Sequence, residues 1–364
     1  MTATTTTAKT ASEMVWTVAE NATPPESNGQ VLWESGLTVG DLIDVNTEYE
    51  VWKRDYNILA SEIALTDDGR FHLDTTSEDH GFEIEDHALR QVCEMLGRAA
   101  TGKRIPFEYV RHLIQNHPDM YQYILARHAA DRGDKGIQLR TYHDSIRGYM
   151  GDKYSGIGNV EMLEILDVAL RDKADNKYEL IRPFIGRDGL TVRVMARNVN
   201  LPNGDSVYGM GVVIRTGEIG NISPCVCPFI QRHSCTNSTV WTEEAFKLKQ
   251  VGDKEAKITL LAAAIIDKLG ESAEMLNRMM EARMAKLPKI DTVISKLVEN
   301  NGWSEAVSMQ IVRGTEGEKT VAGLVNGITF AAHAADVDHE TAYELEGIGG
   351  TFLMAGPQYA EHYR

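Results

Sequence analysis

Three of the four cysteines lie close together, with a histidine among them: Cys225, Cys227, His233 and Cys235. Thiolate sulfur and imidazole nitrogen are preferred zinc ligands, so this cluster is the first candidate for a metal centre. Structural zinc sites usually have two or more residues between paired cysteines, whereas only Val226 separates the first pair here. The alternation instead predicts a strand with Cys225 and Cys227 on one face, as buried reduced thiols. We expect no metal and no cofactor, and keep zinc at these four residues as the alternative.

Motifs of the common catalytic loops are absent from the chain. It contains neither a G-x-x-x-x-G-K-[ST] loop nor a G-x-G-x-x-G turn, and neither a G-x-S-x-G nor an H-E-x-x-H motif. These motifs serve phosphate binding, serine hydrolysis and zinc proteolysis. A Cys235 nucleophile with His233 as its base would lack a third group to orient the base. The sequence therefore predicts no enzyme and no catalytic residues.

Basic and aromatic side chains are interleaved through the middle of the chain. We expect a nucleic-acid-binding surface formed by Arg140, Arg147, Lys153, Tyr154, Arg193, Arg197 and Arg232. Cations neutralise phosphates and aromatic rings stack on any base, which is the chemistry of sequence-independent single-strand binding. Arg193 and Arg197 are four residues apart on an expected strand, so they share a face. The alternative is an ordinary surface of salt bridges, because acidic residues occupy the same segment.

The distribution of charge restricts where such a surface could lie. The net charge is -16, and residues 1–102 contain 6 basic and 19 acidic side chains. Residues 103–215 contain 17 basic and 14 acidic side chains. Affinity for a polyanion comes mainly from clustered Lys and Arg, so only this middle segment could bind nucleic acid.

Hydrophobic patterning predicts where the chain resides. The longest uncharged apolar stretch, residues 258–266, is much shorter than the roughly 20 residues that cross a bilayer. The threonine-rich start MTATTTTAKTASE lacks the basic and apolar regions of a secretory signal. We expect a cytoplasmic protein without membrane contact.

The elements that would position these residues predict an α+β fold, in which a mostly antiparallel sheet with packed helices is followed by a mainly helical C-terminal third. Gly/Pro/Asp turns and period-two patterns mark strands, and apolar spacings of three and four mark helices. We expect four regions: a disordered tail over 1–30, a small β entry region over 31–84, an α+β core domain over 85–240 and a helical region over 241–364.

Several elements can be predicted individually. Helices are expected over 85–131, and a β-hairpin should turn near residues 143–145. Asn159 should cap a helix, and three strands should follow it. A long helix with methionine on its apolar face is expected from Ile258 until Pro288 stops it, and its methionines should lie in the core or in a helix–helix interface.

Four stretches taken together resemble the phage and plasmid protein family known as domain of unknown function 932. They are IPFEYVRHLIQNHPDMYQYIL, LRTYHDSIRGYMGDKYSGIGNVEMLE, GVVIRTGEIGNISPCVCPFIQRHSCTNS and TVAGLVNGITFAAHAADVDHETAYELEGIGG, between about Ile105 and Gly350. Besides Arg140, Arg147, Lys153 and Tyr154, positions that match the family motifs include Asn159, Cys235, Asn237, Asn326 and His339.

The resemblance implies a phage or mobile-element accessory protein of DNA metabolism in the host cytoplasm. Together with the basic middle segment, it leads us to expect ATP-independent binding and annealing of single-stranded DNA by a homo-oligomer. The alternative is an acidic interaction protein that mimics DNA and binds a host or phage DNA-processing or defence protein.

Overall fold

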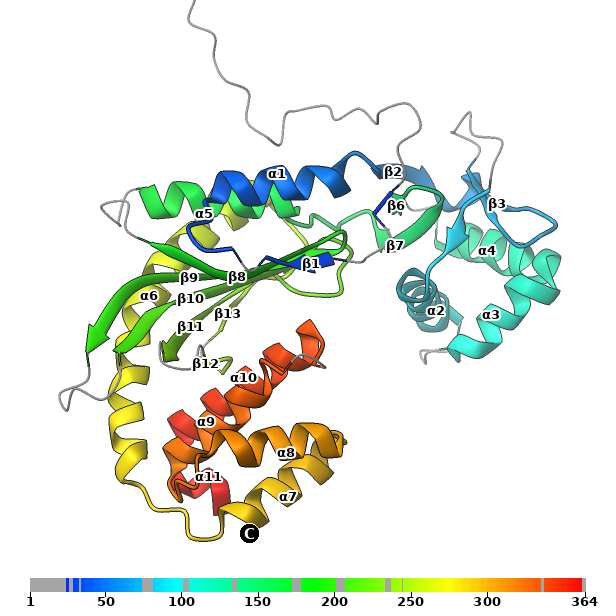
Figure 1. Cartoon of the computed structure of the whole chain (residues 1–364). Coiled ribbons are helices and arrows are strands. Elements are labelled where there is room, and N and C mark those ends of the chain that lie inside the picture. The colour runs from blue at the N-terminus through cyan, green and yellow to red at the C-terminus, as the bar shows by residue number, and fades with distance from the viewer. Residues whose placement is uncertain are drawn as a thin grey trace, which may run out of the picture.

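The computed structural model describes residues 24–25, 29–32, 34–73, 81–100, 105–132, 136–171, 178–200, 207–232, 237–243, 245–334 and 337–361. It confirms the predicted α+β class (Figure 1). Among the described residues, no helix is both long enough and apolar enough to cross a membrane.

The main sheet has antiparallel strands in the order β1-β8-β9-β10-β11-β12, with β13 paired to β11. The strands are β1 (Gly29–Val31), β8 (Glu179–Gly186), β9 (Gly189–Asn200), β10 (Val207–Gly217), β11 (Cys225–Arg232), β12 (Asn237–Val240) and β13 (Phe246–Lys247). At an irregularity in the β9–β10 pairing, a Cβ on Gly211 would lie 1.8 Å from the carbonyl oxygen of Val194, so only glycine fits there.

The two faces of the main sheet are covered by different helices. Alternation along β9 and β10 directs Val192, Val194, Val212 and Ile214 toward a core shared with α1 (Val39–Glu50), α5 (Asn159–Arg171) and the first half of α6 (Lys254–Met284). The residues between them, such as Arg193, lie on the opposite face, where α10 (His339–Ala355) packs. Sequence alternation thus separates an apolar face from one that carries charges.

A second sheet contains β2 (Lys53–Leu59), β6 (Gly136–Tyr142), β7 (Ser145–Gly151) and β5 (Glu83–Ile84), in the order β2-β6-β7-β5. Helices α2 (Asp86–Ala100), α3 (Phe107–Asn116) and α4 (Pro118–Arg132) share a core with it. A short hairpin of β3 (Ile63–Leu65) and β4 (Phe71–Leu73) lies between β2 and β5 in the chain, with the turn η2 (Ala60–Glu62) before it. Figure 1 shows this part beside the main sheet.

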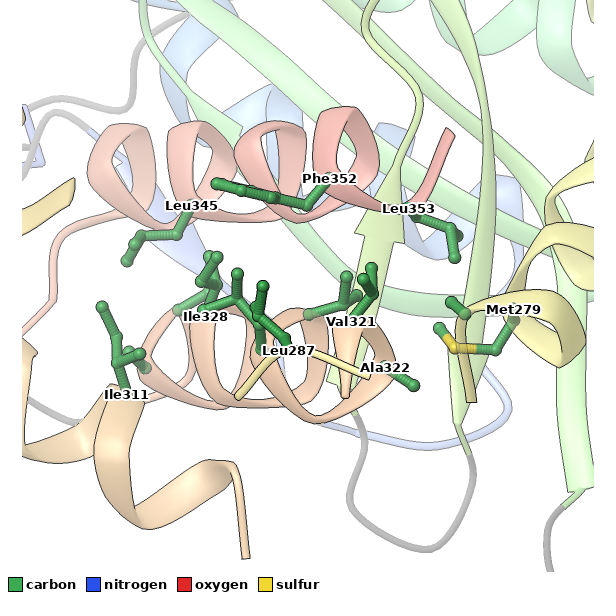
Figure 2. Packing of buried hydrophobic residues seen from close by; sticks show 14 of the residues in the cluster. Met279, Leu287, Ile311, Val321, Ala322, Ile328, Leu345, Phe352 and Leu353 are labelled. Carbon is green, nitrogen blue, oxygen red and sulfur yellow. The ribbon is translucent and has the colours of Figure 1, made fainter. Parts of the chain in front are cut away.

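The C-terminal third is helical, as predicted. It contains the second half of α6, then α7 (Ile290–Asn301), α8 (Glu305–Gly314), α9 (Val321–Ala331), α10 and α11 (Pro357–Glu361). In Figure 2, Leu345 and Phe352 on α10 face Ile328 on α9, with Ile311 of α8 and Met279 of α6 at the edges. The methionine-rich helix is therefore a core element, as Met275 and Met279 are buried.

The N-terminal part differs from the expectation. Residues 39–50, expected within a small β region, form helix α1, and residues 29 and 30, expected in the tail, belong to strand β1. Of the strands in this part of the chain, β1 joins the main sheet, β2 and β5 join the second sheet, and β3 and β4 pair with each other. The rest of the expected tail, residues 1–23 and 26–28, lies outside the described residues.

Candidate functional site

Four residues singled out in the sequence, Arg140, Arg147, Tyr154 and Asn159, converge on one buried residue, Glu218. Glu218 follows β10 and is 3 % exposed. Its Oε2 accepts from Arg147 Nη2 at 2.9 Å and lies 2.8 Å from Lys53 Nζ. Its Oε1 accepts from the backbone N–H of Asn159 at 2.8 Å. Its carbonyl oxygen accepts from Arg140 Nη1 at 2.8 Å and lies 2.6 Å from Tyr154 Oη.

These residues, which we call the Glu218 cluster, are Lys53, Arg140, Arg147, Tyr154, Asn159 and Glu218. Burial would raise the pKa of Glu218, but Lys53 and Arg147 outweigh it and hold that pKa well below its usual range. Glu218 is therefore ionised, and Glu50, Asp55 and Asp188 supply further countercharges for Lys53, Arg140 and Arg147. The cluster links the second sheet, through β2, β6 and β7, to the end of β10 and the start of α5.

Two residues of the expected nucleic-acid surface, Arg140 and Arg147, are occupied by contacts within the protein. Arg147 is 1 % exposed and also donates to Asp188, while Arg140 pairs with Asp55 at 3.3 Å. Their guanidinium groups therefore connect the two sheets. Because Arg147 is buried, a phosphate cannot reach it in this conformation. Lys153 is exposed in the turn after β7, and Arg232 is half-buried at the end of β11.

A pocket of about 250 Å³ lies between the main sheet and the C-terminal helices. Charged and titratable residues lining it are Arg182 on β8, Arg193 on β9, His333 after α9, and His339 and Glu346 on α10. We call it the junction pocket. One predicted nucleic-acid residue, Arg193, and one family-motif residue, His339, meet here.

Arg193 and Glu346 form a buried ion pair in the wall of the junction pocket. Arg193 Nη2 donates to Glu346 Oε2 at 2.6 Å, and the two side chains are 6 % and 0 % exposed. Two of their polar atoms, Arg193 Nε and Glu346 Oε1, are buried without a hydrogen-bond partner among the described residues. Buried polar atoms are rarely left unpaired, so this pair retains the capacity to bind something further.

Arg182 contributes the second guanidinium group of the pocket. Its φ is +42°, in the left-handed region that non-glycine residues seldom adopt, at an irregularity in the pairing of β8 with β9. Its Nη1 lies 2.6 Å from Nδ1 of His333. Because a guanidinium group can only donate, Nδ1 is the acceptor in this contact, while Nε2 of His333 lies 3.4 Å from the backbone N–H of Ser238. That Nε2 lies 3.7 Å from Glu346 Oε1.

Both histidines of the junction pocket are neutral. Burial, together with Arg193 and one other arginine in each case, lowers their pKa values to about 3. His339 is held by a stacked contact with Phe184, with ring centroids 4.1 Å apart, and by a 3.0 Å contact of its Nε2 with Thr191 Oγ1. It begins α10, whose N-cap is Asp338.

The protonation state of Glu346 is set by opposing effects in the pocket. Burial raises its pKa, and Arg193 and Arg182 only partly oppose that effect. When Glu346 is ionised, the charges of the described residues that line the pocket, two guanidinium groups and one carboxylate, sum to +1. The arrangement is suited to an anion.

The other motif residues lie near this junction or elsewhere in the core. Asn237 on β12 donates from its amide to the carbonyl oxygen of Asn326 on α9 at 3.1 Å. Asn159 donates to Asn46 Oδ1 and to the carbonyl oxygen of Gly186. They hold elements together rather than line the pocket. The side chain of Arg197, and Cys235 and His233 entirely, lie outside the described residues.

The expected buried thiols are present on β11. Cys225 and Cys227 are buried on the sheet face that contacts α10, and Cys227 Sγ lies 3.4 Å from Tyr343 Oη. The hydrogen bond with Cys227, then burial, raises the pKa of Cys225 well above its ordinary value. Among the described residues, no group of three or more His, Cys, Asp or Glu side chains could hold a metal ion.

The sequence did not identify Arg182, His333, Glu346 or Glu218 as site residues. No local motif marks them, since the residues of the junction pocket come from β8, β9, the end of α9 and α10, and Glu218 follows β10. A weak signal exists on α10, where residues 339, 342 and 346 are spaced to share one helical face. Comparison with family models, curated proteins and solved structures finds no match to this chain.

Proposed function

We propose that the protein binds a small oxyanion in the junction pocket, and that the phosphate group of a nucleotide or nucleic acid is its natural source. The observation that carries this proposal is the pairing of two guanidinium groups with a single carboxyl group in one cavity, with Arg193 Nε lacking an acceptor. A planar guanidinium group is the side chain best matched to phosphate oxygens.

The size of the pocket limits what can enter. Its 250 Å³ lies just below the roughly 300–1,000 Å³ of typical small-molecule sites. Such a cavity has room for a phosphate group and part of one sugar. A strand of DNA would therefore engage it through one phosphate, and a succession of stacked bases would not fit.

This proposal modifies the single-strand expectation drawn from the sequence. Arg140 and Arg147 are committed to Glu218, so the proposal does not depend on them. The resemblance to a mobile-element family favours nucleic acid as the source of the phosphate. The proposal requires neither annealing nor an oligomer.

Calorimetric titration of the full chain tests the proposal. Sulfate, inorganic phosphate, thymidine monophosphate and a single-stranded oligonucleotide with and without a 5′-phosphate are the probes. We expect saturable binding of the small anions, and an affinity at least about tenfold lower in Arg182→Gln, which keeps length and polarity but removes the charge. Arg171→Gln, at an exposed arginine of α5, is the control and should bind as the original chain does.

The oligonucleotide arms distinguish the sources. If the oligonucleotide binds only when it carries a 5′-phosphate, the pocket binds the phosphate at the end of a strand. If both oligonucleotides bind equally, the pocket binds an internal phosphate. Binding of thymidine monophosphate alone assigns it to free nucleotides. Absence of binding for every probe at millimolar concentration, or unchanged affinity in Arg182→Gln, would overturn the proposal.

A further inference from the structure

Glu346 is an unusual component of an anion pocket, because an ionised carboxylate repels the anion that the arginines attract. Glu346 is fully buried, lines the pocket and has one oxygen, Oε1, without a hydrogen-bond partner in the described structure. With a proton on Oε1, the same group becomes a hydrogen-bond donor to the anion. Its protonation therefore changes its effect from repulsion to attraction.

The net charge of the pocket also favours the uptake of a proton together with a dianion. With both histidines neutral and Glu346 ionised, the net charge of +1 on the described lining residues matches one negative charge. A dianion such as sulfate would leave one buried negative charge uncompensated, which is costly in a poorly solvated site. Uptake of a single proton restores neutrality.

The neighbouring groups show which atom can accept this proton. Glu346 is faced by Arg193 from β9, Arg182 from β8, Arg215 from β10, His333 from the end of α9 and His339 from its own helix. The arginines are already protonated. Protonation of His333 at Nδ1 would break its contact with Arg182. His339 is enclosed by Phe184 and Thr191. Among the described residues, Oε1 of Glu346 is buried without a hydrogen-bond partner, so it can take a proton without loss of a hydrogen bond.

We propose that the junction pocket takes up a dianionic oxyanion together with one proton from solvent, which binds to Oε1 of Glu346. This inference rests on the proposed anion-binding function and adds its regulation. No covalent bond of the anion changes, and the complex is neutral overall. Binding of a dianion then becomes tighter as the pH falls.

Sulfate is the best probe, because it stays fully ionised between about pH 6 and about pH 9. Above the pKa of Glu346 in the empty pocket, sulfate affinity should fall about tenfold for each unit of rise in pH, until the pKa in the filled pocket is reached. Titration in buffers of different ionisation enthalpy should show uptake approaching one proton per sulfate in this range. Nitrate, a monoanion, should bind with much less proton uptake.

Glu346→Gln supplies a permanent donor in place of the protonated carboxyl group. We expect it to bind sulfate with an affinity that changes less than about twofold over the same range, and without proton uptake. Proton uptake that persists in His333→Gln, whatever the affinity of that variant, excludes His333 as the group that takes the proton. Glu299→Gln, at an exposed position of α7, is the matched control and should keep the full pH dependence.

The outcomes separate this inference from the function on which it rests. If sulfate binds without proton uptake, or if Glu346→Gln keeps the pH dependence, the inference fails while anion binding stands. If proton uptake disappears in His333→Gln instead, the proton resides on His333 and the inference is also wrong. If neither sulfate nor nitrate binds, the proposed function itself fails.

Discussion

Arg193 and Glu346 are 153 positions apart in the chain and share a hydrogen bond of 2.6 Å between Nη2 and Oε2. The bond connects β9 of the main sheet to α10 of the helical third, and both side chains are buried. This pair therefore contributes both to the junction of two parts of the protein and to the wall of the pocket. Its loss should affect stability as well as binding.

Removing one member of this pair should be strongly destabilising. In Arg193→Met the carboxylate of Glu346 would remain buried without its cation, and breaking such a pair costs about 3–5 kcal/mol. Urea denaturation at neutral pH measures this cost. The double variant Arg193→Met with Glu346→Leu should recover most of the stability, because neither member of the pair is then left buried without the other. A loss below about 1 kcal/mol in the single variant would contradict the prediction.

The two neutral histidines predict a loss of stability in mild acid. Their pKa values of about 3 lie below the ordinary 6.5, so the unfolded chain binds protons below about pH 6.5 while the folded chain does not. Each histidine should lower the free energy of unfolding by about 1.4 kcal/mol per pH unit between about pH 6 and about pH 3.

Single replacement of His333 or His339 by Gln isolates this contribution. We measure the slope of the unfolding free energy against pH between about pH 6 and about pH 5. In each variant this slope should decrease by the contribution of the histidine that was replaced. That window lies above the range in which most carboxyl groups titrate. A slope identical to that of the original chain would show that the replaced histidine is protonated in the folded protein.

The Glu218 cluster should be among the most sensitive positions of the fold. Glu218→Gln removes the buried carboxylate that Arg147 and Lys53 share and leaves them only Asp188 and Glu50, so we expect a loss of about 3 kcal/mol in urea unfolding. Glu299→Gln removes an exposed carboxyl group and should leave the unfolding free energy unchanged. Similar stability for the two variants would mean that the buried cations are compensated by other groups.

Two helical glycines predict opposite responses to alanine. A Cβ on Gly350 in α10 would lie 1.9 Å from the carbonyl oxygen of Val240, so Gly350→Ala must push α10 away from β12. We expect a loss of at least about 2 kcal/mol. Gly270 in α6 has nothing within 4 Å, and Gly270→Ala should gain about 0.5–1 kcal/mol through helix propensity. Thermal unfolding of both variants checks the two signs.

Periodicity predicted most of the elements, and its failure at α1 has a specific cause. The buried positions of α1 include Asn46 between Leu42 and Tyr49, and a polar residue at a buried position interrupts the apolar pattern. Asn46 is inside because its Oδ1 accepts from Asn159 of α5. A local signal was present, since Thr38 and Asp41 form a capping box that marks the start of a helix.

The site was less predictable than the fold for a different reason. The sequence identified Arg140, Arg147 and Arg193 as important cations, but it could not assign their partners. Glu218 lies 71 positions from Arg147, and Glu346 lies 153 positions from Arg193. Whether an arginine binds a ligand or an internal carboxyl group depends on such distant pairings, which composition and spacing do not encode.

The 31-residue helix α6 belongs to two cores at once. Leu261 and Ile265 in its first half pack with α5 and the main sheet, whereas Met275 and Met279 in its second half pack with the C-terminal helices. A chain cut near Gly270 would give two fragments, each with half of this helix and an uncovered apolar surface. We therefore expect neither fragment to fold alone, and the two to regain structure only when they are mixed.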